Sequence, residues 1–310
     1  MNKLNLKSLP RLKDSISYLY IERGVIERDD KSICVFDETG KTQIPVAIVT
    51  LLMLGPGTKI SHAAIQTTAA TGCLICWVGE ESVRFYAAGM GETRSASFLI
   101  KQAQLVSNRE SRIAVARAMY SMRFEGPVAP NLTIDQLRGK EGARVRDIYL
   151  RESKKYGVPW NGRSYNRNDW DCSDNLNKAL SSANACLYGV CHAAIVSLGL
   201  SPGLGFIHVG KQLSFVYDIA DLYKAELTIP VSFEMAASGD SELERAVRLR
   251  LRDAFREQKI MDRIANDIFG LLKLAEEQGD RFANDSAAPG ELMGDDTAIV
   301  GGVNRGSDSS

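Results

Sequence analysis

The sequence lacks an apolar run long enough to span a bilayer. Its two most apolar stretches cover residues 44–54 and 185–200. Both fall short of the ~18 continuous apolar residues that a transmembrane helix needs. The opening segment, MNKLNLKSLPRLKDS, also lacks the apolar core of a secretory signal. We therefore expect a cytoplasmic protein without membrane contacts.

Cysteine is too sparse for a disulfide framework, since six residues are spread over a chain of 310. Cys73 and Cys76 form a CxxC pair, but the sequence has no second such pair and no histidine near it. Both lie in CLICWVG, whose composition indicates a buried strand. The pair is therefore interpreted as core packing rather than as a zinc or redox site.

The chain also lacks an excess of charge, because 38 basic residues balance 38 acidic ones. This balance at first argues against a nucleic-acid partner, but the charges are unevenly placed. Residues 91–170 carry 15 basic and 8 acidic side chains, a local excess of +7 (15 − 8). We therefore expect a strongly positive face on a neutral protein.

Strand patterns come first along the chain, and helical patterns follow. Residues 16–88 hold segments rich in β-branched and aromatic residues, at 16–22, 32–37, 43–54, 73–79 and 83–88, and an alanine-rich helix at 61–72. From about residue 93 the spacing is helical, over 133–155, 175–199, 215–225 and 241–276. This order predicts an α+β fold with a β-rich domain at 1–90, a helical domain at 91–279 and a disordered tail at 280–310.

Glu141 is the first candidate for chemistry. It lies in QLRGKEGARVR among Arg138, Lys140, Arg144 and Arg146. Such cations hold a carboxylate in its ionised form, which suits a metal ligand or a base. From the local sequence alone, a solvated glutamate that forms ion pairs along its helix is the stronger interpretation.

Two aspartates share one predicted helix. Asp218 and Asp221 are three residues apart in SFVYDIADLYK, so both carboxylates project from the same face. The helix is apolar nearly all round and should be buried, where two carboxylates are costly unless a cation or hydrogen-bond donors compensate them. Helix capping is the plainer alternative; it accounts for Asp218 but not for Asp221, a full turn further in.

His208 lies ten residues before Asp218, after an apolar stretch predicted to be a strand and before a tight turn at Gly210 and Lys211. A lone histidine in such a place is more often a core residue. A histidine that converges with Glu141 and the aspartates instead gives a site of imidazole and carboxylate ligands without a thiolate. Such ligands select Mg²⁺ or Mn²⁺.

A row of cations recurs at helical spacing in ELERAVRLRLRDAFREQK. Its members are separated by steps of 3, 4, 4 and 3 and so share one helix face: Arg245, Arg248, Arg252, Arg256 and Lys259. Like charges in register repel one another, and the phosphates of a polyanion such as DNA would relieve that repulsion. The alternative is a solvated face.

A second segment, YGVPWNGRSYNRNDW, interleaves aromatic residues with arginines. This mixture suits base stacking combined with phosphate contact, or else a loop that folds on its own aromatic side chains. The predicted DNA-binding residues are therefore the five cations of the row together with Arg163, Tyr165, Trp170 and Lys211.

Five motifs resemble those of the CRISPR-associated integrases of the spacer-acquisition module, the first family in the Cas nomenclature, and especially members from cascade-type (subtype I-E) systems. The motifs are PGTKISHAAI, WVGEESVRFYAAG, QLRGKEGARVR, YGVPWNGRSYNRNDW and GFIHVGKQLSFVYDIADLYK. The resemblance, over about residues 12–278, implies a β-rich domain for dimer and partner contacts and a helical catalytic domain. It also implies a homodimer that assembles with a small companion CRISPR-associated protein.

Carried over residue by residue, the resemblance implies that Glu141, His208 and Asp221 hold Mg²⁺ or Mn²⁺ and that Asp218 is also needed for activity. The implied reaction inserts new spacer DNA into a CRISPR repeat array: a DNA 3′-hydroxyl attacks a phosphodiester, and water in its place gives endonuclease activity. Two rivals remain. One is a metal-dependent phosphohydrolase acting on a small phosphate ester, and the other is a non-catalytic DNA-binding subunit.

Overall fold

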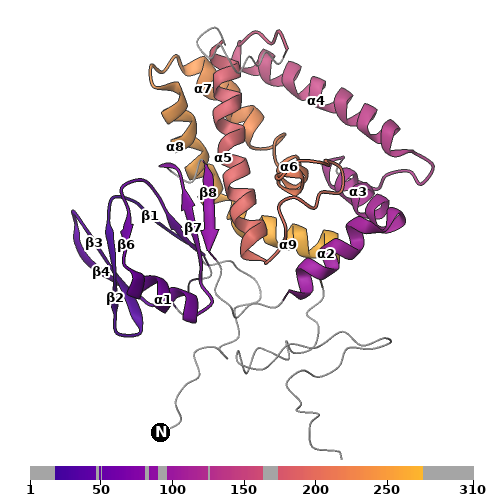
Figure 1. Cartoon of the computed structure of the whole chain (residues 1–310). Coiled ribbons are helices and arrows are strands. Elements are labelled where there is room, and N and C mark those ends of the chain that lie inside the picture. The colour runs from indigo at the N-terminus through magenta and orange to yellow at the C-terminus, as the bar shows by residue number, and fades with distance from the viewer. Residues whose placement is uncertain are drawn as a thin grey trace, which may run out of the picture.

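The computed structural model describes residues 18–46, 49, 51–80, 84–89, 96–124, 126–162 and 174–274. Strands precede helices along the chain, which confirms the predicted α+β class (Figure 1). The change occurs between Gly89, where the last described strand ends, and Ser97, where the next helix begins. The predicted tail at 280–310 lies outside the described residues, as do Arg163, Tyr165 and Trp170.

The N-terminal part holds β1 (Tyr18–Ile21), β2 (Val25–Asp29), β3 (Ser32–Asp37), β4 (Gly40–Ile44), β5 (Leu51–Leu54), β6 (Lys59–Ile60), α1 (His62–Ala70), β7 (Leu74–Val78) and β8 (Phe85–Gly89). The strands form two four-stranded sheets, in the orders β1-β5-β7-β8 and β4-β3-β2-β6. In the first sheet β1, β5 and β7 are parallel and β8 is antiparallel. In the second, β2, β3 and β4 form antiparallel hairpins, and β6 is parallel to β2.

The local signals for turns and caps agree with the structure. The β2–β3 turn places Asp30 at a φ of 53°, and the β3–β4 turn places Gly40 at 127°. Both values lie in the left-handed region, which Gly and Asp tolerate better than most residues. Ser61 caps α1 by accepting a hydrogen bond from the N–H of Ala64, as its sequence predicts.

The single strand predicted over residues 43–54 is wrong. β4 ends at Ile44 and pairs with β3, whereas β5 begins at Leu51 and pairs with β1 and β7. Pro45, between them, has no N–H to donate to a strand ladder. Every residue of β5 is buried, so its pattern is continuously apolar and gives no sign of where the strand begins.

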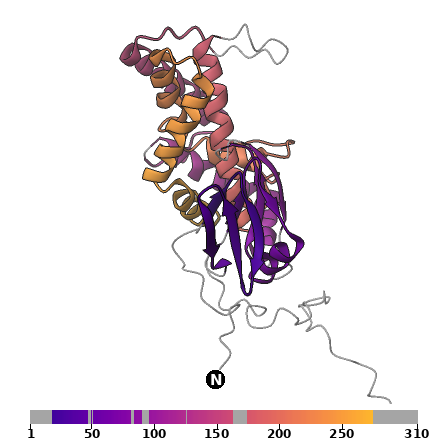
Figure 2. The same cartoon turned by 90° about the vertical axis from the view of Figure 1, so that its left-hand side faces the viewer.

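The C-terminal part is helical. It comprises α2 (Ser97–Ser107), α3 (Arg109–Arg123), α4 (Ile134–Tyr156), α5 (Asn175–Ser197), α6 (Ser214–Ala220), α7 (Thr228–Ser238), α8 (Leu243–Glu257) and α9 (Ile260–Leu272). The helices predicted over 133–155 and 175–199 are confirmed as α4 and α5. The strands and α1 lie to one side of the other helices in Figure 1, and the view turned by 90° shows the strand-rich part facing the viewer (Figure 2).

Two predicted helices differ from the structure. The segment 241–276 contains two helices, because Lys259 adopts a left-handed conformation with a φ of 47° and separates α8 from α9. The helix predicted over 215–225 ends as α6 at Ala220, so Asp221 lies at its C-cap rather than within it. The residues before His208 are not a strand either; among those described from 201 to 209, the backbone is irregular.

One buried apolar cluster joins the β1-β5-β7-β8 sheet to the helices. Leu51 and Leu74 from the sheet belong to it, as do Leu187 of α5 and Phe215 of α6. By length and composition α5 is the one described helix that could cross a membrane, but most of its apolar window is buried inside the fold. Its hydrophobicity is therefore explained by its place in the core.

The CxxC pair is buried on the two faces of the same sheet. Cys76 packs in the cluster that contains α5, and Cys73 packs in a second cluster with Ile26 and Ala64. Side chains on opposite faces cannot ligate one ion together, which supports the packing interpretation.

His192 links α5 to the sheet by stacking on Phe85 of β8, with the two ring centroids 3.7 Å apart. Burial lowers the pKa of His192 to about 4, so the folded state keeps this ring neutral at pH values where the unfolded chain protonates it. The free energy of unfolding should therefore fall as the pH drops from about 6.5 to about 4.

We expect His192→Phe, which keeps an aromatic ring against Phe85 but cannot be protonated, to lose less stability over this pH range. Urea unfolding of both proteins at several pH values between neutral and about 4 measures the difference. Parallel stability curves for the two proteins would show that His192 does not couple protonation to folding.

Candidate functional site

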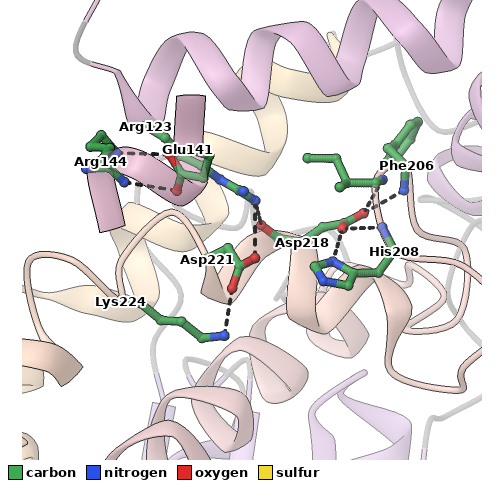
Figure 3. A network of polar contacts seen from close by, with 9 residues as sticks. Arg123, Glu141, Arg144, Phe206, His208, Asp218, Asp221 and Lys224 are labelled. Atoms are coloured by element: carbon green, nitrogen blue, oxygen red, sulfur yellow. Dashed lines mark hydrogen bonds and ion pairs between the residues drawn. The ribbon is translucent and has the colours of Figure 1, made fainter. Parts of the chain in front are cut away.

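The Asp218 carboxylate is fully buried and organises the segment before α6 (Figure 3). Its Oδ2 accepts hydrogen bonds from the backbone N–H groups of Phe206, at 2.6 Å, and Ile207, at 3.0 Å. Its Oδ1 accepts from the backbone N–H of His208, at 2.8 Å, and contacts that residue's ring Nδ1, at 2.7 Å. These donors offset the cost of burying the carboxylate.

The contact with Asp218 sets the tautomer of His208. A carboxylate only accepts hydrogen bonds, so Nδ1 carries a proton, and in the neutral form of the ring Nε2 is the nitrogen with the lone pair. The His208 side chain is 42% exposed, whereas Asp218 is fully buried. The imidazole is therefore hydrogen-bonded on its buried side, at Nδ1, and its exposed side remains open to a ligand or substrate.

Glycine at position 205 permits this arrangement. A Cβ there would overlap the backbone carbonyl of His208 and the side chain of Ser214. Because backbone atoms block the position, no side chain could be accommodated without moving the His208 segment.

Asp221 follows directly after α6 and forms ion pairs with two cations. Its Oδ1 lies 2.7 Å from Lys224 Nζ, and its Oδ2 lies 3.6 Å from Arg123 at the end of α3. Burial alone would raise the pKa of Asp221, but Lys224 and Arg123, with a smaller contribution from His208, outweigh it and hold the pKa below its ordinary value. Asp221 is therefore a carboxylate at neutral pH.

Glu141 approaches from α4, a helix that begins at Thr133 with a capping box. Its carboxylate receives two hydrogen bonds from Arg144, at 2.9 and 3.1 Å. The Glu141 side chain is 14% exposed, so it is not the solvated glutamate that the local sequence favours. The same interpretation also predicted an ion pair along the helix, and the pair with Arg144 confirms that part of it.

Tyr120 of α3 lies close enough to interact electrostatically with both Glu141 and Asp221. Burial raises the pKa of its hydroxyl, and charges that act on it include Arg123, Glu141 and Asp221. Among the described residues, however, no three His, Cys, Asp or Glu side chains lie close enough to form a ready metal cluster. The donor chemistry of Glu141, His208 and Asp221 suits Mg²⁺ or Mn²⁺, but in this structure both carboxylates are paired with cations of the chain.

Two further residues of the site, Lys224 and Arg123, were not among those predicted from the sequence. Lys224 is three residues after Asp221, and helical spacing alone would have found it. Arg123 is buried and also donates to the backbone carbonyl of Asp218, across 95 residues of sequence. No local pattern signals such a contact, because it depends on how α3 and α6 pack.

The predicted row of cations is partly engaged within the chain. Arg245 pairs with Glu242, Arg248 with Glu80 after β7, and Arg252 with Asp253. Lys259 lies beyond the end of α8, in the left-handed turn, so it does not belong to the α8 face. Arg256, Lys259 and Lys211 are exposed. DNA contact by these residues stays a prediction.

Together these features define an α+β protein with a carboxylate and histidine site on its helical part. A family model, CRISPR associated protein Cas1, matches residues 18–129 and 122–256. A relative from Thermus thermophilus named CRISPR-associated endonuclease Cas1 2 is 47% identical over 307 residues, covering 98% of this chain and 94% of the relative. CRISPR-associated endonuclease Cas1 of Escherichia coli K12 is 43% identical over 279 residues, covering 90% of this chain and 91% of that protein.

A solved structure described as a TtCas1–DNA complex superimposes with a TM-score of 0.79 at 48% identity, covering 85% of this chain and 99% of that chain. The chain therefore belongs to the Cas1 family, as the motifs of the sequence indicated.

We expect Asp218→Ala to destabilise the fold more than His208→Ala does. The first change leaves the buried N–H of Phe206 and the part-buried N–H groups of Ile207 and His208 without their acceptor and should cost about 3 kcal/mol, whereas the second removes one side-chain hydrogen bond, worth about 1–2 kcal/mol. Urea unfolding of both variants measures the difference. Equal destabilisation by the two changes would contradict a role for Asp218 in holding the loop.

Proposed function

We propose that this protein is a metal-dependent DNA integrase and endonuclease of CRISPR spacer acquisition. It would join a DNA 3′-hydroxyl to a phosphodiester of the repeat array by transesterification. The observation that carries the proposal is that the buried Asp218 fixes the Nδ1 side of the His208 imidazole, while Asp221, close enough to interact electrostatically with His208, is held ionised by Lys224 and Arg123. The names of the relatives, which are endonucleases, and the DNA complex of a family member support it.

Glu141, His208 and Asp221 would hold Mg²⁺ or Mn²⁺. When bound, such an ion would offset the negative charge that develops on the phosphoryl oxygens. Asp218 keeps the Nδ1 proton in place, so the Nε2 of His208 is available to the ion or to the proton of the attacking hydroxyl. Lys224 and Arg123 keep Asp221 ionised for either arrangement.

The DNA would lie along positive surface near this site. The proposed contacts are Arg245, Arg248, Arg252, Arg256 and Lys259, with Arg163, Tyr165, Trp170 and Lys211. We further propose a cytoplasmic homodimer that assembles with a small companion CRISPR-associated protein.

A specific observation favours the non-catalytic alternative. Asp218 has its full set of amide donors, and Asp221 is paired with Lys224 and Arg123, so both carboxylates are compensated without an ion. A DNA-binding subunit would need no more than this. The two functions differ in whether the carboxylates matter for strand transfer.

We expect Glu141→Ala, His208→Ala and Asp221→Ala each to lower strand transfer by at least about a hundredfold, because each would remove several kcal/mol of transition-state stabilisation. DNA affinity should change little, since none of the three is among the proposed DNA contacts. Integration and cleavage assays, with circular dichroism as a check of folding, measure the effect.

Asp147→Ala is the matched control for Glu141→Ala, since Asp147 is an exposed acid on the same helix. It should retain activity. Strand transfer by a folded Asp221→Ala protein at the wild-type rate would favour the non-catalytic subunit.

Chelation tests the ion directly. EDTA should abolish strand transfer, and Mg²⁺ or Mn²⁺ should restore it, because the proposed ligands are carboxylates and an imidazole. Ca²⁺ should bind without supporting turnover. DNA binding in the presence of EDTA is the control, and full strand transfer after exhaustive chelation would contradict a metal-dependent mechanism.

A further inference from the structure

The segment that carries His208 has little regular backbone hydrogen bonding of its own. Between residues 201 and 208 the described backbone forms neither helix nor strand, although parts of it are buried. Buried N–H and C=O groups need partners. Here side chains from three different helices supply many of them.

The first partner is Gln102 of α2, whose side chain is fully buried. Its Oε1 accepts a hydrogen bond from the N–H of Ser201, at 2.8 Å. Its Nε2 donates to the carbonyls of Ser201, at 3.0 Å, and Leu204, at 3.1 Å. A buried amide is costly unless it is hydrogen-bonded, and this one donates twice and accepts once, each time with a single loop about a hundred residues away in sequence.

The second and third partners hold Phe206 from two sides. Arg112 of α3 donates from Nε to the Phe206 carbonyl, at 3.0 Å. The N–H of Phe206 donates to Asp218, as do those of the next two residues. The peptide units on either side of Phe206 are therefore anchored to α3 and to α6, two residues before the imidazole.

We propose that Gln102, assisted by Arg112, is a positioning residue for His208. Gln102 fixes the start of the loop and Arg112 fixes its middle, so that the N–H groups of 206–208 meet the Asp218 carboxylate and Nδ1 of His208 keeps its proton toward Oδ1. Neither residue touches the reacting groups. Both act through the loop, and the inference that this matters for strand transfer rests on the proposed function.

The consequence is geometric. Without its anchor at Ser201 and Leu204, the loop can rotate. Water then competes with Asp218 for the hydrogen bond to Nδ1 of His208. The imidazole then samples both tautomers, and Nε2 is no longer presented consistently beside Asp221. A displacement of about 1 Å at a reacting group costs up to roughly a hundredfold in rate.

The test is Gln102→Met, which has a similar length but makes no hydrogen bonds. Long-range ¹H–¹⁵N NMR of the imidazoles reports the tautomer directly, and the chain has three histidines, so each signal can be assigned by single replacement. We expect the wild-type His208 signal to show a protonated Nδ1. In Gln102→Met the signal should move toward the mixture of the two neutral tautomers that free histidine shows. We expect kcat to be lower by about tenfold to a hundredfold and the Kd for DNA to be unchanged.

Thr68→Val is the matched control, because Thr68 is also fully buried and donates its side-chain hydrogen bonds within α1, in the strand-rich part. It should leave the His208 signal and kcat as in the wild type. If Gln102→Met does not fold, Arg112→Met, at a half-buried position, gives the same readouts.

An unchanged His208 tautomer in the folded variant would overturn the proposal, whether kcat falls or not. Because the NMR signal is read without metal or DNA, this result is independent of whether the protein is an integrase.

Discussion

The arrangement of the site depends on one buried carboxylate, which accepts hydrogen bonds from backbone N–H groups that belong to no helix or strand. Asp218 collects three consecutive N–H groups and the proton of an imidazole. An apolar residue there would leave those donors without their acceptor. A charge in the core is thus stabilised by the loop that it shapes, and the position of His208 follows from it.

The helix that carries Asp218 is placed by the core rather than by its own length. α6 spans only Ser214–Ala220, too short to be stable alone, but Phe215, Val216 and Ile219 are buried in the cluster built around α5. The same cluster reaches the β1-β5-β7-β8 sheet. The strand-rich part and the helical part therefore share apolar packing, and the site rests on both.

Residue pattern was sufficient where structure is local. Periodicity located α4 and α5, and the spacing of Asp218 and Asp221 singled out two carboxylates that the structure places in one network with Arg123 and His208. It failed where backbone conformation or packing decided: Lys259 breaks a helix without Gly or Pro, and the apolar residues of β5 continue an apolar pattern that begins before the strand does. It could not find contacts made across the fold, such as those of Arg123, because sequence spacing carries no information about which helices touch.

The proposed metal ligands Glu141 and Asp221 already form ion pairs with cations of the chain. Glu141 is paired with Arg144, and Asp221 is paired with Lys224 and Arg123. Of the site's acidic residues, only Asp218 is held by backbone N–H groups instead of a cation. A structural metal site differs, because its ligands repel one another until the ion binds and folding depends on it. An ion bound under the proposed function would therefore have to compete with these cations for the carboxylates.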